Sequence, residues 1–393
     1  MSSQLSSRQL ALAIVALSLG GFGIGTVEFA MMGLLPNVAD GVHVTIPEAG
    51  HLISAYALGV VVGAPIIVAL TARMRRKHLA LALMGLFTLG NLSSVAAPDF
   101  WSLLISRFVA GLPHGAFFGV AAVIAASLVA PTKRGRAISM VMLGLSVANV
   151  IGVPLATFIG QNFGWRLLFI LVGLIGILTI CAIAFFVPLQ PAPHDASILT
   201  ELSALKRIQV WLALLIGIVG FGGFFAVYAY IAPTMTEVTG LDKAWLPLVV
   251  ALYGVGMVIG NVIGGRLADR SVMRSIYLVM GLMAVVLVVF SLAVHFIGTA
   301  LLLVLILGAV GSSLTPALQT RLLDVSPGAE SLASSMNHSA LNIANALGAF
   351  LGGLVIAWGW GYTAPALVGA VLAILGLGIA VFSGRFDRRT TAG

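Results

Sequence analysis

The chain has 393 residues, of which 60% are hydrophobic and only 8% are charged. Ordinary soluble domains carry roughly 25% charged residues, so this composition excludes a soluble globular protein and indicates a chain that crosses a membrane many times. The net charge of +8 does not indicate nucleic acid, because the basic residues are concentrated in alternate connections between apolar segments.

Apolar segments long enough to cross a bilayer follow one another along the whole chain. We expect twelve helices, over residues 9–36, 49–72, 78–97, 101–130, 136–161, 166–188, 209–236, 244–266, 275–295, 298–323, 331–357 and 362–384. Two long uncharged runs must be divided by turns, which we place at 295–298 and 359–362. The apolar/polar alternation of barrel strands is missing, so the sequence predicts an all-α polytopic membrane protein.

The basic residues predict the orientation of these helices. Seventeen of the twenty lysines and arginines fall in alternate connections: Arg8, Arg73, Arg75, Arg76, Lys77, Lys133, Arg134, Arg136, Lys206, Arg207, Arg266, Arg270, Arg274, Arg321, Arg385, Arg388 and Arg389. Connections facing the cytoplasm carry such an excess of positive charge. We therefore expect both termini and the central connection to be cytoplasmic.

The chain divides into two similar halves. A polar connection over 189–208 separates six predicted helices from six more. "SVANVIG" (146–152) matches "NIANALG" (342–348) at an offset of 196 residues, and Gly63 and Arg73 match Gly260 and Arg270 at 197. We predict two pseudo-symmetric six-helix bundles, 1–188 and 209–393, joined by a linker over 189–208, with a substrate site between them.

The stretch "GNVIGGRLADRSVMR" (260–274) is the clearest local motif. Asp269 is placed to pair with Arg270 or Arg274, and such a loop can act as a conformational latch that opens when those contacts break. The alternative is a solvated loop that holds only the arginines of a cytoplasmic connection. The first half has a degenerate copy, "GAPIIVALTARMRRK" (63–77), which contributes Arg73.

The motif "GGRLADRSVMR" resembles the cytoplasmic-loop signature of the major facilitator superfamily. In the first-half copy, Ala72 stands where that family usually has an aspartate. The stretches "RFVAGLPHG" (107–115) and "GLSVANVIGVP" (144–154) are similar to signatures of the drug:proton antiporter branch. The stretch "GTVEFAMMGLLP" (25–36) resembles its arabinose-efflux and chloramphenicol-exporter subgroup. The resemblance implies proton-driven efflux of small molecules such as drugs, sugars or metabolites across the bacterial inner membrane.

Two charged residues stand inside predicted membrane helices. Glu28 is the only charged residue between Gln9 and Ala39, and an ionised group in hydrocarbon is costly and usually functional. Arg107, Gly111 and His114 share one helix face, because they are spaced at i, i+4 and i+7. We predict that Glu28 and Arg107 form a proton-coupling pair; the alternative is a static ion pair between two helices.

Several polar and aromatic residues are candidates for lining a substrate cavity. Each has an alternative role: the tyrosines as interfacial anchors, Phe224 as a lipid contact, His338 as a packed histidine, and the asparagines as hydrogen-bonding residues between helices. The candidates are Tyr56, His114, Asn149, Phe224, Tyr228, Tyr230, His338 and Asn345. We assign Gly111, Gly144, Gly152 and Pro154 to helix packing or kinking.

Other classes of function fit the sequence less well. An intramembrane enzyme would need paired carboxylates, a His-Glu-x-x-His motif or a Ser-x-x-Lys set within the membrane, and a pump driven by ATP would need a phosphate-binding loop. We therefore expect a transporter rather than an enzyme, with no metal and no cofactor beyond a proton gradient. A passive facilitator or an importer of the same fold is the remaining alternative. For the protein itself we expect a small-molecule substrate, protons and the lipid bilayer as partners, and we expect it to act as a monomer.

Overall fold

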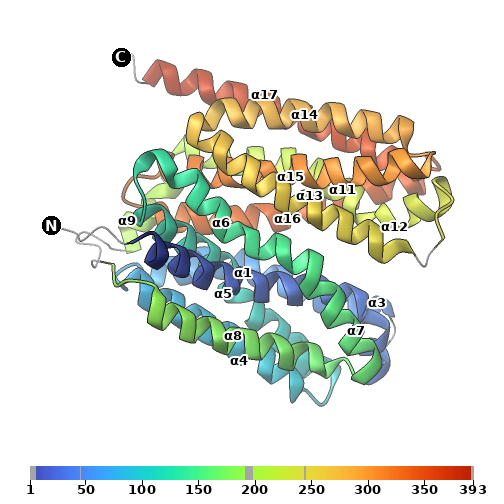
Figure 1. Ribbon diagram of the computed structural model, residues 1–393, viewed down its shortest axis with the longest axis horizontal. Coiled ribbons are helices and arrows are strands. Elements are labelled where there is room, and N and C mark those ends of the chain that lie inside the picture. The colour runs from blue at the N-terminus through green and yellow to red at the C-terminus, as the bar shows by residue number, and fades with distance from the viewer. Residues whose placement is uncertain (1–5, 45, 191–197, 243–244, 391–393) are drawn as a thin grey trace. The chain divides into compact units, whose positions relative to one another are not determined.

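The computed structural model describes residues 6–44, 46–190, 198–242 and 245–390. Every regular element within these ranges is a helix (Figure 1). Twelve helices in the described ranges are long and apolar enough to span a membrane, which confirms the predicted all-α architecture. Residues 191–197 of the predicted linker lie outside the described ranges.

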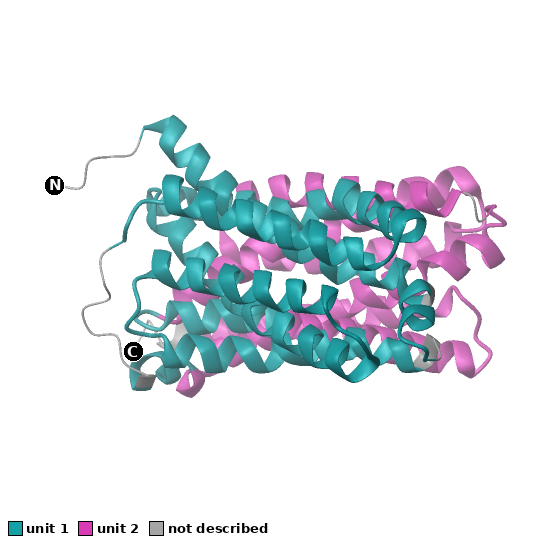
Figure 2. Cartoon of the chain, turned by 90° about the horizontal axis from the view of Figure 1, so that it is seen from below, with its two compact units in different colours: residues 1–204, 327–339 teal, residues 205–326, 340–393 magenta. Residues whose placement is uncertain are grey.

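Contacts between residues divide the chain into two compact units, coloured separately in Figure 2. Unit 1 contains residues 1–204 and 327–339, and unit 2 contains residues 205–326 and 340–393. The short segment 327–339, which includes the first turns of a long helix of the second half, thus packs with the first half. Its contacts are described with unit 1 below.

Unit 1 is a bundle in which α3 packs along α5, α4 against α5 and α8, and α1 against α6 and α8. Its elements are α1 (Ser7–Gly33), α2 (Leu35–Gly41), α3 (Ile46–Leu70), α4 (Arg76–Val95), α5 (Phe100–Ser127), α6 (Arg134–Val147), α7 (Val153–Phe163), α8 (Arg166–Phe186), α9 (Ile198–Leu202) and the beginning of α16 (Glu330–Ala357). The first helix starts at a capping box, in which Ser6 accepts from Gln9 N–H and the Gln9 side chain accepts from Ser6 N–H.

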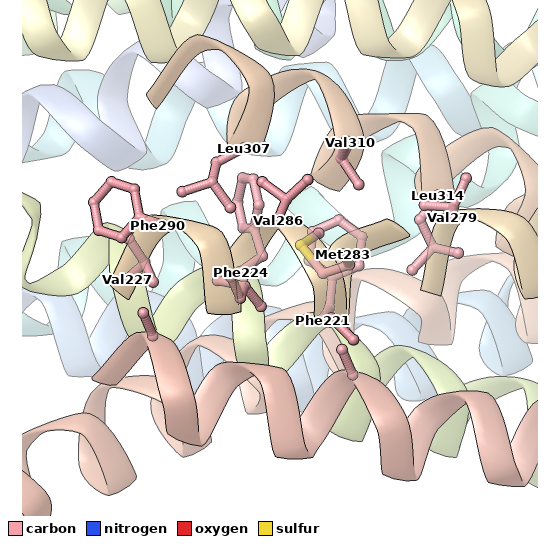
Figure 3. Close-up of a cluster of buried hydrophobic side chains, with 14 of the residues drawn as sticks. Phe221, Phe224, Val227, Val279, Met283, Val286, Phe290, Leu307, Val310 and Leu314 are labelled. Carbon is pink, nitrogen blue, oxygen red and sulfur yellow. The ribbon is translucent and has the colours of Figure 1, made fainter. Parts of the chain in front are cut away.

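Unit 2 repeats this plan, with α13 packed along α15 and α14 against α15 and α17. Its elements are α10 (Ile208–Leu215), α11 (Phe221–Ala229), α12 (Ile231–Pro233), α13 (Leu246–Arg270), α14 (Val272–Ala293), α15 (Ile297–Val325), the remainder of α16, and α17 (Ala364–Thr390). The two turns predicted within long uncharged runs are confirmed, since α14 ends at Ala293 before α15 and α16 ends at Ala357 before α17. Buried apolar side chains of α11, α14 and α15 interdigitate in its core (Figure 3).

The fifth predicted span contains a wide turn of helix. A π-helical segment over Ala148–Gly152 joins α6 to α7, and Pro154 lies in the first turn of α7. Proline has no backbone N–H and clashes with the preceding turn, so the backbone there must depart from regular α geometry. Widened turns of this kind are one of the identifiable causes of helix bending.

Arg166, at the first residue of α8, closes the end of α4. Its guanidinium donates to the carbonyl oxygens of Val95 at 3.2 Å and Ala97 at 3.0 Å, and it lies 4.3 Å from the ring centroid of Trp165. The last carbonyl groups of a helix have no partners within the helix, and a cation there offsets the negative end of the helix dipole. Arg166 thus provides hydrogen-bond donors for carbonyl groups at the end of the neighbouring helix α4.

Candidate functional site

The position of α5 is set by its cap. Asp99 accepts a hydrogen bond from the N–H of Ser102 at 2.8 Å, so the helix begins at Phe100. That backbone hydrogen bond is the main cause of the lowered pKa of Asp99, because it favours the charged carboxylate. From this start, the helix places Arg107 and His114 two turns apart on a buried face, with exposed fractions of 1% and 2%.

The Arg107 guanidinium is packed among aromatic rings. Its Cζ atom lies 4.3 Å from the ring centroid of Tyr56 and 5.8 Å from that of Phe169, within the range of cation–π attraction. Its Nε and Nη1 atoms are buried without a hydrogen-bond partner in the described part of the chain. A buried cation with two such nitrogens requires a nearby negative charge.

Glu28, on α1, supplies that charge. The side chains of Glu28 and Arg107 interact electrostatically, and Tyr56 lies within the field of both. Close packing brings α1 to this position, because a Cβ at Gly25 would touch the Cβ of Ala148 at 3.0 Å. The structure therefore brings together the two charged residues that the sequence singled out within the membrane spans.

A chain of polar and aromatic side chains continues from this pair within unit 1. The Tyr56 hydroxyl lies 3.1 Å from Nδ1 of His114, and the His114 ring centroid lies 5.4 Å from that of His338. His338 stacks on Phe118 with ring centroids 4.2 Å apart and planes inclined by 11°. Hence His114 and His338, which come from different halves of the sequence, share one site.

The first turns of α16 fit closely against α5 and α3. The hydroxyl of Ser335 donates to the carbonyl of Ala116 at 3.5 Å, and that of Ser339 donates to the carbonyl of Val60 at 3.3 Å. A Cβ at Gly119 would overlap the backbone of Ser335. Small residues and serine hydroxyls thus bring His338 to the site by close backbone approach.

Other cavity candidates gather in unit 2. Tyr253, which sequence reasoning missed, has its ring centroid 4.7 Å from that of Tyr228 and 5.1 Å from that of Phe224. Phe224 is only 4% exposed and belongs to the core, which excludes the lipid-contact alternative (Figure 3). The Tyr230 hydroxyl donates to the carbonyl of Ala349 on α16 at 2.7 Å, so it is used in a hydrogen bond within the protein.

The asparagine candidates differ from each other. Asn149 is 2% exposed and donates from Nδ2 to the carbonyl of Leu145, one turn back on its own helix, at 3.0 Å. Asn345, its repeat counterpart, is half-buried on α16. The structure thus shows an intrahelical bond for the first asparagine and places neither in the polar chain of unit 1.

The residues assigned to helix packing lie at close contacts between helices. A Cβ at Gly111 would overlap the carbonyl oxygen of Tyr56, and one at Gly144 would overlap that of Ser18. A Cβ at Gly152 would overlap the hydroxyl of Thr26. Only glycine permits the backbones to approach this closely.

The predicted latch residues occupy the ends of helices. Asp269 is half-buried in the last turn of α13, with Arg270 exposed beside it and Arg274 exposed at the start of α14. Arg73 is exposed in the turn between α3 and α4. The latch stays a prediction.

Comparison with known proteins identifies the family. The pattern of the Major Facilitator Superfamily matches residues 17–327 and 214–392. The chain belongs to this superfamily. It is 42% identical over 379 residues to the inner membrane transport protein YdhP of Escherichia coli K12, covering 96% of this chain and 97% of that protein.

Two further proteins are similar to the chain. It is 32% identical over 356 residues to the chloramphenicol resistance protein of Streptomyces lividans, covering 90% of each. The human organic anion transporter MFSD10 has the same fold, with a TM-score of 0.79 at 14% identity over 96% of this chain and all of that one. The chain is therefore a small-molecule transporter, not an enzyme, and a multi-pass protein of the bacterial inner membrane.

Within this major facilitator protein, sequence reasoning missed Phe118, Phe169 and Tyr253. Phenylalanine is common in apolar helices, so nothing in the sequence marks the first two. Tyr253, however, lies 197 residues after Tyr56, at the offset that relates the two halves. Extending the repeat to the two helices that contain Tyr56 and Tyr253 would have found it.

Proposed function

We propose that the protein is a proton-coupled exporter in which Glu28 carries the proton and Arg107 is its charge partner. The observation that supports this proposal is the electrostatic interaction between these two charged side chains at one end of the Tyr56–His114–His338 chain. Proton-driven efflux needs a group that binds a proton in one state and releases it in another, and a carboxyl group beside a buried cation has that property.

The chemistry follows from the surroundings of Arg107. When Glu28 is ionised, its charge balances the guanidinium, whose Nε and Nη1 atoms have no hydrogen-bond partner in the described part of the chain. When Glu28 takes up a proton, that balance is lost, and Arg107 is left as a buried cation beside Tyr56. The two protonation states therefore favour different surroundings, which couples proton binding to conformational change.

Chloramphenicol is a reasonable first substrate to test. A relative is named for resistance to this compound, which carries an aromatic ring. The buried aromatic cluster of Phe224, Tyr228 and Tyr253 in unit 2 supports a preference for such rings. We propose amphiphilic compounds with an aromatic ring as the substrate class.

The test uses inside-out membrane vesicles from a host that lacks its own exporters. With an acidic lumen, vesicles that contain the wild-type protein should accumulate labelled chloramphenicol above the outside concentration. Glu28→Gln mimics the protonated carboxyl and should abolish this accumulation, while exchange of labelled for unlabelled compound continues. Glu48→Gln, which changes an exposed carboxyl in the first turn of α3, is the matched control and should behave like wild type.

The outcomes separate the alternatives. A wild-type protein that equilibrates the compound without concentrating it is a passive facilitator. Accumulation only when the gradient is reversed indicates import. If Glu28→Gln still concentrates the compound with an unchanged pH dependence, Glu28 is not the proton carrier.

A further inference from the structure

A side chain from the linker holds the first turn of α16. Glu201, in the short helix α9, accepts a hydrogen bond from the backbone N–H of Leu332 at 3.0 Å. The two residues are 131 positions apart in the sequence, and both belong to unit 1. Glu201 is only 6% exposed, so its carboxyl group is buried against α16.

The surroundings of Glu201 act on its charge in both directions. The first N–H groups of a helix lack partners within the helix, and their aligned dipoles favour an anion. Arg76, the first residue of α4, adds a positive charge, whereas Glu330 adds a negative one. Burial raises the pKa of Glu201, and the Leu332 hydrogen bond and Arg76 only partly offset that rise.

The same site contains the residue that departs from the superfamily pattern. Ala72, Arg76, Glu201 and Ser331 are among the residues around a cavity of about 10 Å³, near the smallest that holds one water molecule. Ala72 is 8% exposed, and the residue 197 positions later is Asp269. Where the second half has a loop aspartate, the first half has a methyl group and a carboxyl group from the linker.

The turn that Glu201 holds leads directly into the candidate functional site. His338 lies six residues after Leu332, which corresponds to about 9 Å along a helix axis. Between and beyond them, the hydroxyls of Ser335 and Ser339 bond to carbonyl groups of α5 and α3. The position of the first turn therefore fixes where His338 meets His114 and Phe118.

We infer that Glu201 is a positioning residue, in which a linker carboxyl group takes the place of the missing loop acid at position 72 and anchors the start of α16. It acts through α16 on His338. This deepens the proposed function and rests on it only in so far as transport depends on the placement of His338. An ordinary helix cap would stabilise α16 without being interchangeable with an acid at position 72.

Hydrogen–deuterium exchange of the purified full-length protein in nanodiscs tests the anchor without a substrate. Glu201→Ala removes the acceptor, so the peptide containing Leu332 should exchange roughly tenfold to hundredfold faster, the range for losing a hydrogen bond to a charged group. Glu201→Gln retains an acceptor oxygen and should stay near wild type. Glu237→Ala, at an exposed carboxyl in unit 2, is the matched control and should change nothing there.

Moving the acid tests the replacement. Ala72→Asp in the Glu201→Ala background should restore slow exchange of the Leu332 peptide. In the wild-type background, Ala72→Asp should speed exchange, because two carboxyl groups then share one small cavity. If Ala72→Asp has opposite effects in the two backgrounds, positions 72 and 201 are energetically coupled, because independent sites have additive effects. Unchanged exchange in Glu201→Ala, or no restoration in the double variant, would overturn the inference.

The pH dependence provides a second measurement if Glu201→Ala does not fold. A raised pKa means that the packed arrangement binds the proton more tightly than a released, solvated Glu201 does. Packing is therefore favoured at low pH, and the protection factor of the Leu332 peptide should fall as the pH rises from the ordinary glutamate pKa through the raised one. Glu201→Gln should remove this dependence; a pH profile equal to wild type contradicts the inference. Because the readout is local exchange, it stands even if Glu28→Gln transports normally.

Discussion

Helices α3 and α5 of unit 1 cross in the same way as α13 and α15 of unit 2, although the residues around the two crossings differ. Gly111 faces the carbonyl oxygen of Tyr56, and Gly308 faces that of Tyr253. The same offset of 197 residues relates two more glycine contacts, Gly59 on Phe108 to Gly256 on Leu305 and Gly63 on Leu112 to Gly260 on Ala309. Glycines thus fix the distance between backbones in both units.

The side chains beyond these crossings have diverged. At the same offset, Arg107 corresponds to Val304, and His114 corresponds to Gly311. Val304 is fully buried in the apolar core of unit 2, where unit 1 has a buried guanidinium. The same backbone geometry therefore supports a polar network in one unit and an aromatic cluster in the other. The glycines determine how the helices cross, and other residues determine the chemistry beside the crossing.

The largest expected effect comes from breaking the crossing itself. Gly111→Ala and Gly308→Ala each place a Cβ against a backbone carbonyl that cannot rotate away, so each should destabilise the protein by about 3 kcal/mol, the upper end for overpacking. Gly85→Ala, whose Cβ meets no atom within 4 Å, is the control and should be neutral or stabilising. Thermal unfolding in detergent measures this. Equal loss for Gly85→Ala would show that the crossing glycines are not special.

A smaller effect should separate the chemistry of the two units. Arg107→Lys keeps the charge but loses the planar group over Tyr56, so the initial rate of pH-driven uptake in vesicles should fall about tenfold. Val304→Ala, at the counterpart position, should leave coupling unchanged. If both variants lose coupling equally, proton coupling does not depend on the polar network of unit 1 alone.

The smallest effect distinguishes the two counterpart tyrosines. Tyr56→Phe leaves His114 without the hydroxyl at 3.1 Å and should lower the stability by about 1 kcal/mol. The Tyr253 hydroxyl is buried with no hydrogen-bond partner in the described part of the chain, so Tyr253→Phe should be neutral or slightly stabilising. Shifts of the unfolding midpoint measure both. A larger loss for Tyr253→Phe would reverse this assignment.

The fold could be predicted because hydropathy and glycine placement act over short distances. The apolar runs fixed the twelve spans, and the turns at 295–298 and 359–362 followed from glycines and polar residues. The electrostatic interaction of Glu28 with Arg107 could be predicted from the sequence, because a buried guanidinium needs a counter-charge and few acidic residues lie within the predicted spans. Tyr253 could also have been predicted from the internal repeat, because it lies 197 residues after Tyr56.

Other parts of the site could not be predicted, because they depend on tertiary placement. Glu201 reads as an ordinary loop acid, and only the fold brings it to Leu332, 131 residues away. The stacking of His338 on Phe118 depends on how closely α16 approaches α5, which glycine and serine spacing does not specify. The wide turn over Ala148–Gly152 shifts the hydrogen-bond partner by one residue, and the proline after it indicates a distortion without specifying that this distortion is a π-helical turn.

The clamp of Arg166 on the end of α4 has an electrical consequence for unit 1. Its guanidinium is matched to the carbonyl groups of Val95 and Ala97, at the end of the bundle where Asp40, Glu48 and Asp99 also lie by chain order. The opposite end carries the arginines and lysines of the other connections. Unit 1 is therefore a dipole along its helices, and the positive charge of Arg166 at the acidic end reduces that dipole in part. A membrane potential acts on each elementary charge with about 2.3 kcal/mol per 100 mV across the full span. The energy of such a dipole in the resting field is lowest with its basic end towards the negative side, which is the orientation that the basic connections predict.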